Sequence, residues 1–539
     1  MPQIQLRPAL LCYATLSVVR VVPDPKRSQT THRWLYAGLA LGLLVLGLPG
    51  AAYADPFHAQ AIPLGQRALG FGGAFTGLAD DPSAAYYNPA GLVWAGDSAL
   101  SASLTLNAFD RRQVANGYRT GRGSTNLRHS SGPSLPGSVS LLKRIGKRKK
   151  SGERKHAIGL SSFAVHQRSL VFDVEVRDDP RMGLATLSMD RSSRTAWSGF
   201  SYAYRLSGKI SIGMTGFLSI TRTQYRDELI ATDLGEVIQE SGAYQSDAGS
   251  WASHRVSTDV KNLVARLGVL YQATDKLRLG LMLQPPSIHV RGQATVRQRT
   301  LDIDRDAGGE GSFLTARQSK LASHDPQAWE IRVGGSYKLR EWLTLTMDTS
   351  LTGGDGSRRN PIVTVGKRSP NAETGAVAEV GYFEVDHWHR SVSGNVAMGS
   401  EMILWDKVAL RTGLFTSLSS SPPIPKFSTE YRNPDVHRVG GAVSVGVNAA
   451  GFDVALGVAG LFGRGDGLSL DITTEGETRY RRTQVTDSTL FVFLTGMRSV
   501  VANLAKTADK MLDDMRKERE REAAMEKQIE KAQKPVPNQ

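Results

Sequence analysis

The feature that most limits the fold of this chain is a period-two alternation of side-chain character between residues 97 and 497. In residues 209–222, Ile, Met and Leu fill most even positions, while Ser, Gly and Thr fill most odd ones. The same alternation recurs in residues 277–283, 329–339, 439–447 and 452–458. Because successive side chains of a β-strand point to opposite faces, the pattern predicts strands whose two faces meet different surroundings. A soluble sandwich also alternates, so length and connections must separate the two folds.

The alternating segments are often about ten to fourteen residues long, whereas strands of soluble proteins average about five or six. Their connections alternate between tight turns and long polar loops. The turns lie near residues 206–208, 273–275, 340–341, 405–406 and 449–451, and the loops near 110–135, 169–193, 224–254, 300–324, 355–385, 419–435 and 465–480. Short turns at one rim and long loops at the other are typical of outer-membrane barrels. We therefore predict an all-β fold, a transmembrane antiparallel β-barrel of about fourteen strands over residues 97–497.

The N-terminus carries an export signal. Residues 35–48 are almost entirely Leu, Ala, Gly and Val, with Arg33 just before them and the small-residue pattern Ala52-Tyr53-Ala54 just after. A basic flank, a short apolar core and an A-x-A site are typical of a cleaved secretory signal peptide. The alternative, a retained anchor, needs about twenty apolar residues. We expect residues 1–54, a signal peptide with an upstream extension, to be removed, and the protein to reach the outer membrane of a Gram-negative bacterium.

Composition excludes several other classes. The single cysteine, Cys12, lies in the segment expected to be removed, so the mature chain has neither disulfides nor thiol ligands. After residue 54 no apolar stretch is long enough for a membrane helix. The formal net charge is +15. In an exported protein such an excess favours outer-membrane lipids and lipopolysaccharide as partners over nucleic acid.

Residues 55–96 do not have the pattern of strands. Asp81 followed by Pro82 is a good N-cap and first helical position, and Pro89 after Asn88 predicts the end of that helix after about two turns. The glycines at 70, 72 and 73 allow close packing or positive φ. A compact, glycine-rich segment before a barrel is suited to fold inside the lumen as a hatch, or plug. The alternative is a periplasmic tail.

A family resemblance lies in the same segment. Residues 65–75, 80–84 and 87–91 resemble the N-terminal hatch of the FadL/TodX family, and weaker similarities follow in residues 274–292, 342–348 and 406–423. That family consists of outer-membrane transporters for long-chain fatty acids and other hydrophobic compounds. The resemblance implies a hatch-closed barrel that takes up hydrophobic small molecules and releases them sideways into the bilayer.

By the same resemblance, a hatch motif falls on six residues: Asp80, Asp81, Asn88, Pro89, Ala90 and Gly91. Of these, Asn88, Pro89 and Ala90 position the hatch, and the two aspartates hold local structure by capping and hydrogen bonds. Five apolar side chains are candidates for lining a ligand pocket: Phe57, Ile62, Leu64, Phe71 and Phe75. The alternative, which we favour, is that they pack the hatch against the barrel wall.

The C-terminal residues 498–539 depart from that family. Apolar residues recur there at three- and four-residue spacing, which predicts a charged helix with an interrupted coiled-coil seam. An even number of strands places it in the periplasm. The helix is either solvated or a docking arm for a periplasmic protein partner. The second case supports an alternative function, a non-transporting outer-membrane barrel that scaffolds partners.

Other candidates for chemistry are weak. The basic run 143–150 falls in a predicted periplasmic turn, where we expect a solvated turn or a lipid headgroup contact. His387 and His389 share one strand face but have no third ligand, so we predict no metal site. No nucleophile elbow or phosphate loop occurs in a supporting context. We therefore expect no cofactor and no enzymatic activity.

Overall fold

The computed structural model describes the chain from Phe57 to Ser499 with gaps. The described residues are 57–58, 62–120, 123–131, 137–146, 154–179, 183–232, 237–238, 243–244, 248–304, 312–354, 362–364, 382–384, 390–405, 407–428, 432–449, 452–471 and 480–499. The expected signal peptide, the residues of the basic turn from 147 to 150, the His387/His389 pair and residues 500–539 lie outside these ranges.

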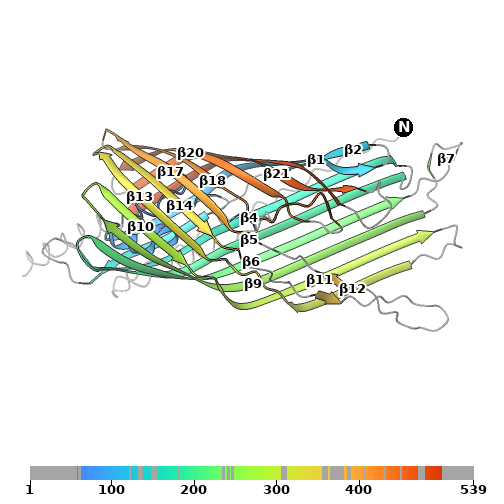
Figure 1. Cartoon of the computed structure of the whole chain (residues 1–539), viewed down its shortest axis with the longest axis horizontal. Helices are drawn as coiled ribbons and strands as arrows, with labels where there is room; N and C mark the ends of the chain where they lie inside the picture. The colour runs from blue at the N-terminus through green and yellow to red at the C-terminus, as the bar shows by residue number, and fades with distance from the viewer. Residues whose placement is uncertain are drawn as a thin grey trace, which may run out of the picture.

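The described strands form one large, almost entirely antiparallel sheet that closes on itself (Figure 1). The first strand, β1, pairs with β3 on one side and with β22, the last strand, on the other. The strands of this sheet are β1 (Ser98–Thr120), β2 (Gly123–Ser131), β3 (Gly137–Ile145), β4 (His156–Asp179), β5 (Gly183–Arg205), β6 (Ile210–Thr232), β9 (Ala248–Gln272), β10 (Leu277–Gln284), β11 (Ile288–Asp304), β12 (Ser312–Ala322), β13 (Glu330–Arg340), β14 (Leu343–Thr352), β17 (Ser393–Leu404), β18 (Val408–Ser417), β19 (Phe427–Ser428), β20 (Asp435–Ala449), β21 (Phe452–Asp471) and β22 (Tyr480–Ser499). Two further antiparallel pairs are formed by β7 (Val237–Ile238) with β8 (Ala243–Tyr244) and by β15 (Ile362–Thr364) with β16 (Tyr382–Glu384).

Of the eighteen strands in the sheet, fifteen close the barrel, where we predicted about fourteen. In some places two shorter strands follow each other where one strand would cross the wall, so the strands outnumber the crossings of the wall. Pro285 and Pro286 separate β10 from β11, yet both strands pair with β9. Proline has no N–H to donate to the ladder, so a crossing breaks where two prolines follow each other.

Among the described residues, the tight turns at 206–208, 273–275 and 340–341 lie where the sequence predicted them, but several of the long loops are shorter than expected. The predicted loop 169–193, for example, is mostly strand, because β4 continues to Asp179 and β5 begins at Gly183. Beyond the apolar band the alternation changes sides rather than ending, because Phe172 and Val174 of β4 are buried on the inner face while Asp173 and Glu175 are exposed. The charged residues on the outward face give this part of the strand the composition of a polar loop, and the sequence analysis assigned it to one.

The outer face of the barrel is apolar, whereas the inner face carries both polar and apolar residues. Met214, Val333 and Leu414 are 55–68% exposed, whereas Thr215 and Asn262 are fully buried. Exposed apolar side chains continue around the ring, on β6, β9, β10, β13, β14, β18, β20 and β21. A continuous outward apolar band on a closed barrel is the feature by which such barrels sit in a bilayer. Among the described residues, no helix is long and apolar enough to cross a membrane.

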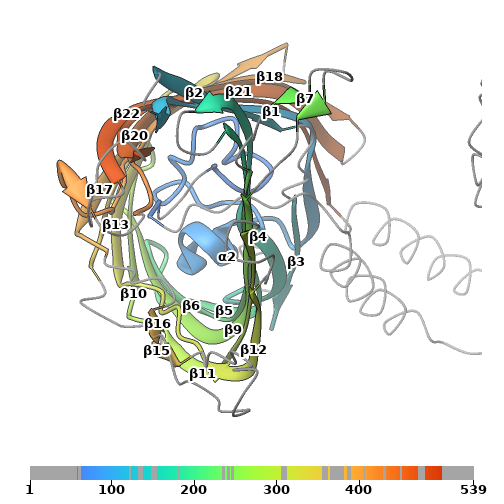
Figure 2. The ribbon, with the colours of Figure 1, turned by 90° about the vertical axis from the view of Figure 1, so that its right-hand side faces the viewer.

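The N-terminal segment, residues 62–96, lies within the ring of strands, as the position of α2 in Figure 2 shows. It contains the one-turn helix α2 (Ala84–Tyr87) and the 3-10 helix η1 (Pro89–Val93). The predicted helix begins two residues later and is shorter than expected, with Ser83 rather than Asp81 at the N-cap. Asp81 instead accepts a hydrogen bond from the backbone N–H of Ser83 at 2.7 Å, which shapes the turn before the helix. The predicted stop at Asn88 is confirmed, because Asn88 is extended, with φ −160° and ψ 97°.

Candidate functional site

The N-terminal segment meets the barrel wall through a buried aromatic cluster. Tyr86 lies 5.1 Å from Tyr87, 5.5 Å from Phe163 of β4 and 5.8 Å from Trp197 of β5, measured between ring centroids. Phe75 and Phe217 extend the cluster at either end. Such ring pairs contribute about 0.5–1.5 kcal/mol each beyond the area they bury. The middle of the lumen on this side is therefore apolar and filled rather than an open aqueous channel.

A buried arginine borders the aromatic cluster. The Arg266 guanidinium lies 3.9 Å above the Tyr86 ring and 5.0 Å from the Trp197 ring. It also donates to the Tyr86 carbonyl and forms an ion pair of 2.9 Å with Glu330. Glu330 pairs in turn with Arg332, whose guanidinium lies 5.3 Å from the Tyr87 ring. The charged wall residues thus pair with one another, and the two arginines also contact the rings of the two tyrosines of α2.

Asn88 connects three parts of the molecule. Its Nδ2 donates to the Thr76 carbonyl and to the Val269 carbonyl of β9, both at 3.0 Å, and its Oδ1 accepts from the Ala90 N–H at 3.2 Å. The Ala90 carbonyl accepts from Ser211 Oγ of β6 at 2.8 Å. The predicted motif residues 88–90 therefore do join the segment to the wall, and Asn88 makes all three of its contacts while fully buried.

Glycines in the barrel wall allow residues 88–90 to lie this close to it. A Cβ at Gly213 of β6 would lie 2.5 Å from the Pro89 carbonyl carbon, and one at Gly268 of β9 only 2.1 Å from Asn88 Oδ1. The two glycines stand directly opposite each other in the ladder. Gly280 of β10 meets the Thr76 carbonyl in the same way. Within the motif, Gly91 has the same function, since a Cβ there would lie 2.0 Å from the Ala79 carbonyl oxygen.

A chain of ion pairs holds the other end of the segment. Arg67 pairs with Asp80 and, at 2.6 Å, with Glu401 of β17. Glu401 also pairs with Arg411 of β18 at 2.8 Å, and Arg411 with Asp453 of β21 at 3.2 Å. Burial alone would lower the pKa of the Arg67 guanidinium, but the carboxylates of Asp80 and Glu401 outweigh it and raise that pKa. Arg67 therefore remains charged, and Asp80 acts in an ionic network rather than as a cap.

Two further carboxylates hold the backbone of the segment. Asp348 of β14 accepts from the N–H groups of Phe75 at 2.9 Å and Thr76 at 2.8 Å. Asp81 accepts from both the N–H and the hydroxyl of Ser83. Burial raises the pKa of the Asp81 carboxyl, although the Ser83 hydrogen bonds and Arg67 act in the opposite direction. Asp81 is thus the motif residue whose protonation depends most on the segment being in place.

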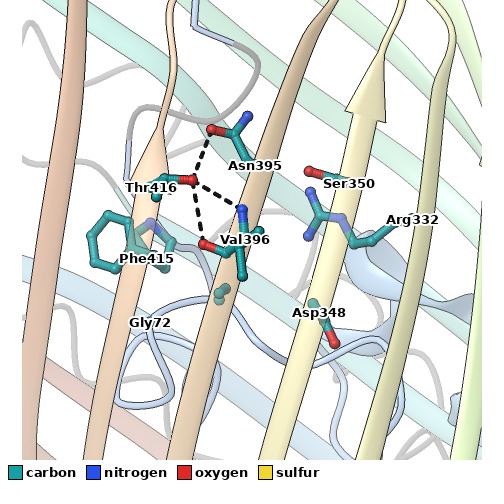
Figure 3. A pocket seen from close by; sticks show the side chains of 11 residues that line it. Gly72, Arg332, Asp348, Ser350, Asn395, Val396, Phe415 and Thr416 are labelled. Atoms are coloured by element: carbon teal, nitrogen blue, oxygen red, sulfur yellow. Dashed lines mark hydrogen bonds between the residues drawn. The ribbon is translucent and has the colours of Figure 1, made fainter.

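A small cavity lined by both polar and apolar groups separates the segment from β14, β17 and β18 (Figure 3). It is lined by Gly72 and Gly73 on one side and by Asp348, Asn395 and Thr416 on the other. Its volume of about 30 Å³ is room for about two waters. A hydrophobic solute does not fit the cavity in this conformation.

The five apolar residues proposed as ligand-lining do not surround one pocket. Leu64, Phe71 and Phe75 belong to the cluster that includes the tyrosines of α2, while Ile62 packs against a separate cluster around Phe415 and Phe491. Phe57 is buried elsewhere, where its carbonyl accepts from Ser420 at 2.7 Å. These contacts favour the packing alternative over the pocket.

Sequence reasoning missed the charged residues of the wall. Glu401, Arg411, Glu330, Arg266 and Asp348 all lie on strands that the alternation predicts, at positions that face inward. A charge in the middle of a membrane strand must face the lumen, so these residues could have been selected by that criterion. No group of three or more His, Cys, Asp or Glu within the described ranges could hold a metal ion.

The geometry defines a class: a membrane-type barrel whose lumen contains an N-terminal segment fixed by Asn88, an ionic chain and an aromatic cluster. No protein-family model and no curated protein sequence matches the chain. Solved structures do match. The crystal structure of the Pseudomonas putida toluene transporter TodX gives a TM-score of 0.54 at 13% identity, covering 81% of this chain and 98% of that one. A Pseudomonas aeruginosa FadL homologue gives 0.52 at 13% identity, covering 82% and 99%.

A deletion mutant of the TodX monoaromatic hydrocarbon channel gives 0.52 at 14% identity over 81% of this chain and 98% of its own. The resemblance that residues 65–91 predicted is therefore confirmed at the level of the fold, which is that of FadL/TodX-type barrels. At sequence identities this low, the structural similarity supports a shared fold but not a shared substrate or mechanism.

Proposed function

We propose that this protein carries hydrophobic small molecules across the outer membrane of a Gram-negative bacterium. The observation that carries the proposal is a lumen filled at mid-height by an aromatic cluster inside a barrel of the FadL/TodX fold. A porin for polar solutes keeps a polar, water-filled lumen. An aromatic surface offers an apolar solute a path on which it stays out of water.

The substrate class follows from chemistry and from the neighbours together. The matched structures are a toluene transporter, a FadL homologue and a monoaromatic hydrocarbon channel. We infer that this chain takes long-chain fatty acids or aromatic hydrocarbons, with lateral release into the bilayer. The N-terminal segment acts as the hatch, because it fills the lumen and leaves no channel for a solute while it stays in place.

Uptake by whole cells tests transport, since apolar compounds dissolve in plain liposomes without a carrier. Cells that lack their own transporter and produce this chain are given radiolabelled oleate or toluene and compared with cells carrying an empty vector. We expect faster uptake of at least one compound, and the compound names the substrate class. Equal uptake of both compounds in both strains would overturn the proposal. If the barrel then retained a periplasmic protein only when residues 500–539 were present, the scaffold alternative would replace it.

A disulfide tests the hatch itself. A Cβ built on Gly70 of the segment lies 2.5 Å from Ser444 Oγ of β20 and 2.8 Å from Arg411 Cβ, so cysteines at positions 70 and 444 are near enough to bond once their neighbours shift slightly. The Gly70→Cys/Ser444→Cys chain, whose other cysteine is Cys12, should lose uptake when oxidised and regain it on reduction. Each single cysteine variant is the control. Full uptake by the oxidised double variant would show that the segment does not need to move.

A further inference from the structure

The outer wall carries a row of arginines beyond the apolar band. Arg226 of β6 stands directly opposite Arg255 of β9, Arg255 opposite Arg297 of β11, and Arg297 opposite Arg317 of β12. All four positions point away from the lumen, because the residues beside them in sequence, such as Tyr225, Val256 and Val296, are buried on the inner face. Four neighbouring strands thus present one arginine each along a line of roughly 15 Å. We refer to these four residues as the arginine row.

Like charges placed directly opposite each other destabilise a sheet, so the arrangement calls for a compensating anion. Arg226 pairs with Glu228 on its own strand at 2.8 Å. Within the described residues, no carboxylate lies within ion-pair distance of Arg255, Arg297 or Arg317. The part of the row on β9, β11 and β12 is therefore a patch of three guanidinium groups without an acidic counterpart in the described part of the chain.

A second basic level lies nearer the apolar band. Ile220 of β6, the last apolar residue of its outward face before Arg222, stands opposite Lys261 of β9, and Lys261 stands opposite Arg291 of β11. Arg222 pairs with Asp259 at 3.0 Å, so this level is partly neutralised. Below it on the same outward face come Leu218, Leu263, Ile288 and Val290, all 39–68% exposed.

The position of these two levels decides what kind of anion fits. Along the outward face, from the apolar band toward the strand ends near the arginine row, the apolar side chains that would contact acyl chains are followed by Lys261 and Arg291. The arginine row lies about four to six residues beyond this second level. At about 3.3 Å per residue, the levels are separated by roughly 13–20 Å along the strands. A soluble anion uses only the charges. A lipid with phosphates above its acyl chains uses the charges and the apolar surface together.

We propose that β6, β9, β11 and β12 form a binding site for a phosphorylated, multiply acylated glycolipid of the outer leaflet, of the lipopolysaccharide type. The arginine row holds phosphate groups of the saccharide, and the apolar residues beneath it hold the acyl chains. The proposal rests on the outer-membrane location of the barrel and not on transport, so cells could show no uptake and the site would still bind its lipid.

The experiment uses the full chain in nanodiscs and measures lipid retained after purification by mass spectrometry. The lipids are a bis-phosphorylated lipid A and the same lipid after enzymatic dephosphorylation. The row variant is Arg255→Gln/Arg297→Gln. The matched control is Arg432→Gln/Arg464→Gln, which removes two exposed arginines outside the row. We expect the row variant to retain at least tenfold less lipid A, the control to equal the wild type, and the dephosphorylated lipid to bind weakly to all three.

Several outcomes would overturn the proposal. Equal losses in the row variant and the control would show that net charge alone attracts the lipid. Equal retention of the dephosphorylated lipid would remove the role of phosphate. Competition by inorganic phosphate at low millimolar concentration would show a free-phosphate site rather than a lipid site. Because the row variant relieves repulsion between like charges, its barrel without lipid should melt no lower than the wild type, and a folding defect is thereby distinguished from lost binding.

Discussion

Replacing Asn88 by alanine tests whether this side chain is what holds the segment against β6 and β9. The change removes three buried hydrogen bonds, to the Thr76 carbonyl, the Val269 carbonyl and the Ala90 N–H. At about 1 kcal/mol net for each, the segment should lose about 3 kcal/mol of its attachment. That is roughly a hundredfold increase in the fraction of molecules whose segment has left the wall.

Amide hydrogen exchange measures this fraction directly. The N–H groups of Gly91 and Trp94 donate to the carbonyls of Asn88 and Gly91, so they exchange when this part of the segment opens. In Asn88→Ala we expect both amides to exchange about a hundredfold faster. Amides of the barrel ladder should keep their rates, because Asn88 belongs to no strand pair.

Asn262→Ala is the control for removing any buried asparagine. Asn262 is fully buried on β9 but donates to the Asp325 carbonyl at 2.7 Å rather than to the segment. Its loss should leave Gly91 and Trp94 unchanged. If the two amides exchange at wild-type rates in a folded Asn88→Ala barrel, the segment is held by other contacts and the reasoning fails.

Three further changes probe the same interface. Gly213→Ala places a Cβ 2.5 Å from the Pro89 carbonyl carbon, so it should speed hydrogen exchange at the Gly91 amide, at an overpacking cost of about 1–3 kcal/mol. The control is Gly216→Ala, three residues further along β6, where the new Cβ meets nothing within 4 Å and the Gly91 amide should exchange at the wild-type rate. Equal effects of the two variants would contradict this prediction. Glu401→Gln removes the carboxylate that Arg67 and Arg411 share, although each keeps one other partner, Asp80 or Asp453. The melting temperature should fall by an amount corresponding to about 1.5–3 kcal/mol, and an unchanged melt would show that the ionic chain adds no stability. Burial raises the pKa of Asp81, so its contribution is fully present below its ordinary value of about 3.8 and is lost as the pH rises through the raised value. The Asp81→Asn chain should therefore gain in melting temperature relative to wild type between pH 4 and pH 8, and a constant difference would refute the assignment.

The sequence was sufficient for those features that depend on neighbouring residues. Alternation predicted the strands, and Pro89 predicted the end of the helix at Asn88. Gly70, Gly72 and Gly73 were expected to allow close packing or positive φ. Gly72 and Gly73 have φ of +64° and +88°, and a Cβ on Gly70 would lie 2.5 Å from Ser444 Oγ. These are local constraints, which one sequence contains in full.

Features that depend on strand register could not be predicted. Arg67 and Glu401 are 334 positions apart, and nothing local indicates that they meet. The arginine row needs the register of four strands at once, because a slip of one residue would turn an arginine toward the lumen. The strand ends beyond the apolar band were assigned to loops for a different reason. Their outward face is charged, as at Asp173 and Glu175, and their buried apolar residues, such as Phe172 and Val174, lie on the inner face instead.

The N-terminal segment, which we propose acts as a hatch, is attached to the wall by different interactions at its two ends, and these would set the order in which it opens. Residues 88–90 are held by buried, uncharged hydrogen bonds and lie against wall glycines with no space between. Gly72 also lies against a wall glycine, since a Cβ on Gly413 of β18 would lie 2.2 Å from the Gly72 nitrogen, but the Gly72–Gly73 turn also borders a water-sized cavity. Local opening starts where packing is thinnest. An apolar solute would therefore displace the Gly72–Gly73 turn from β17 and β18 first, while Asn88 keeps the segment anchored, so that the segment can return to its place without leaving the barrel.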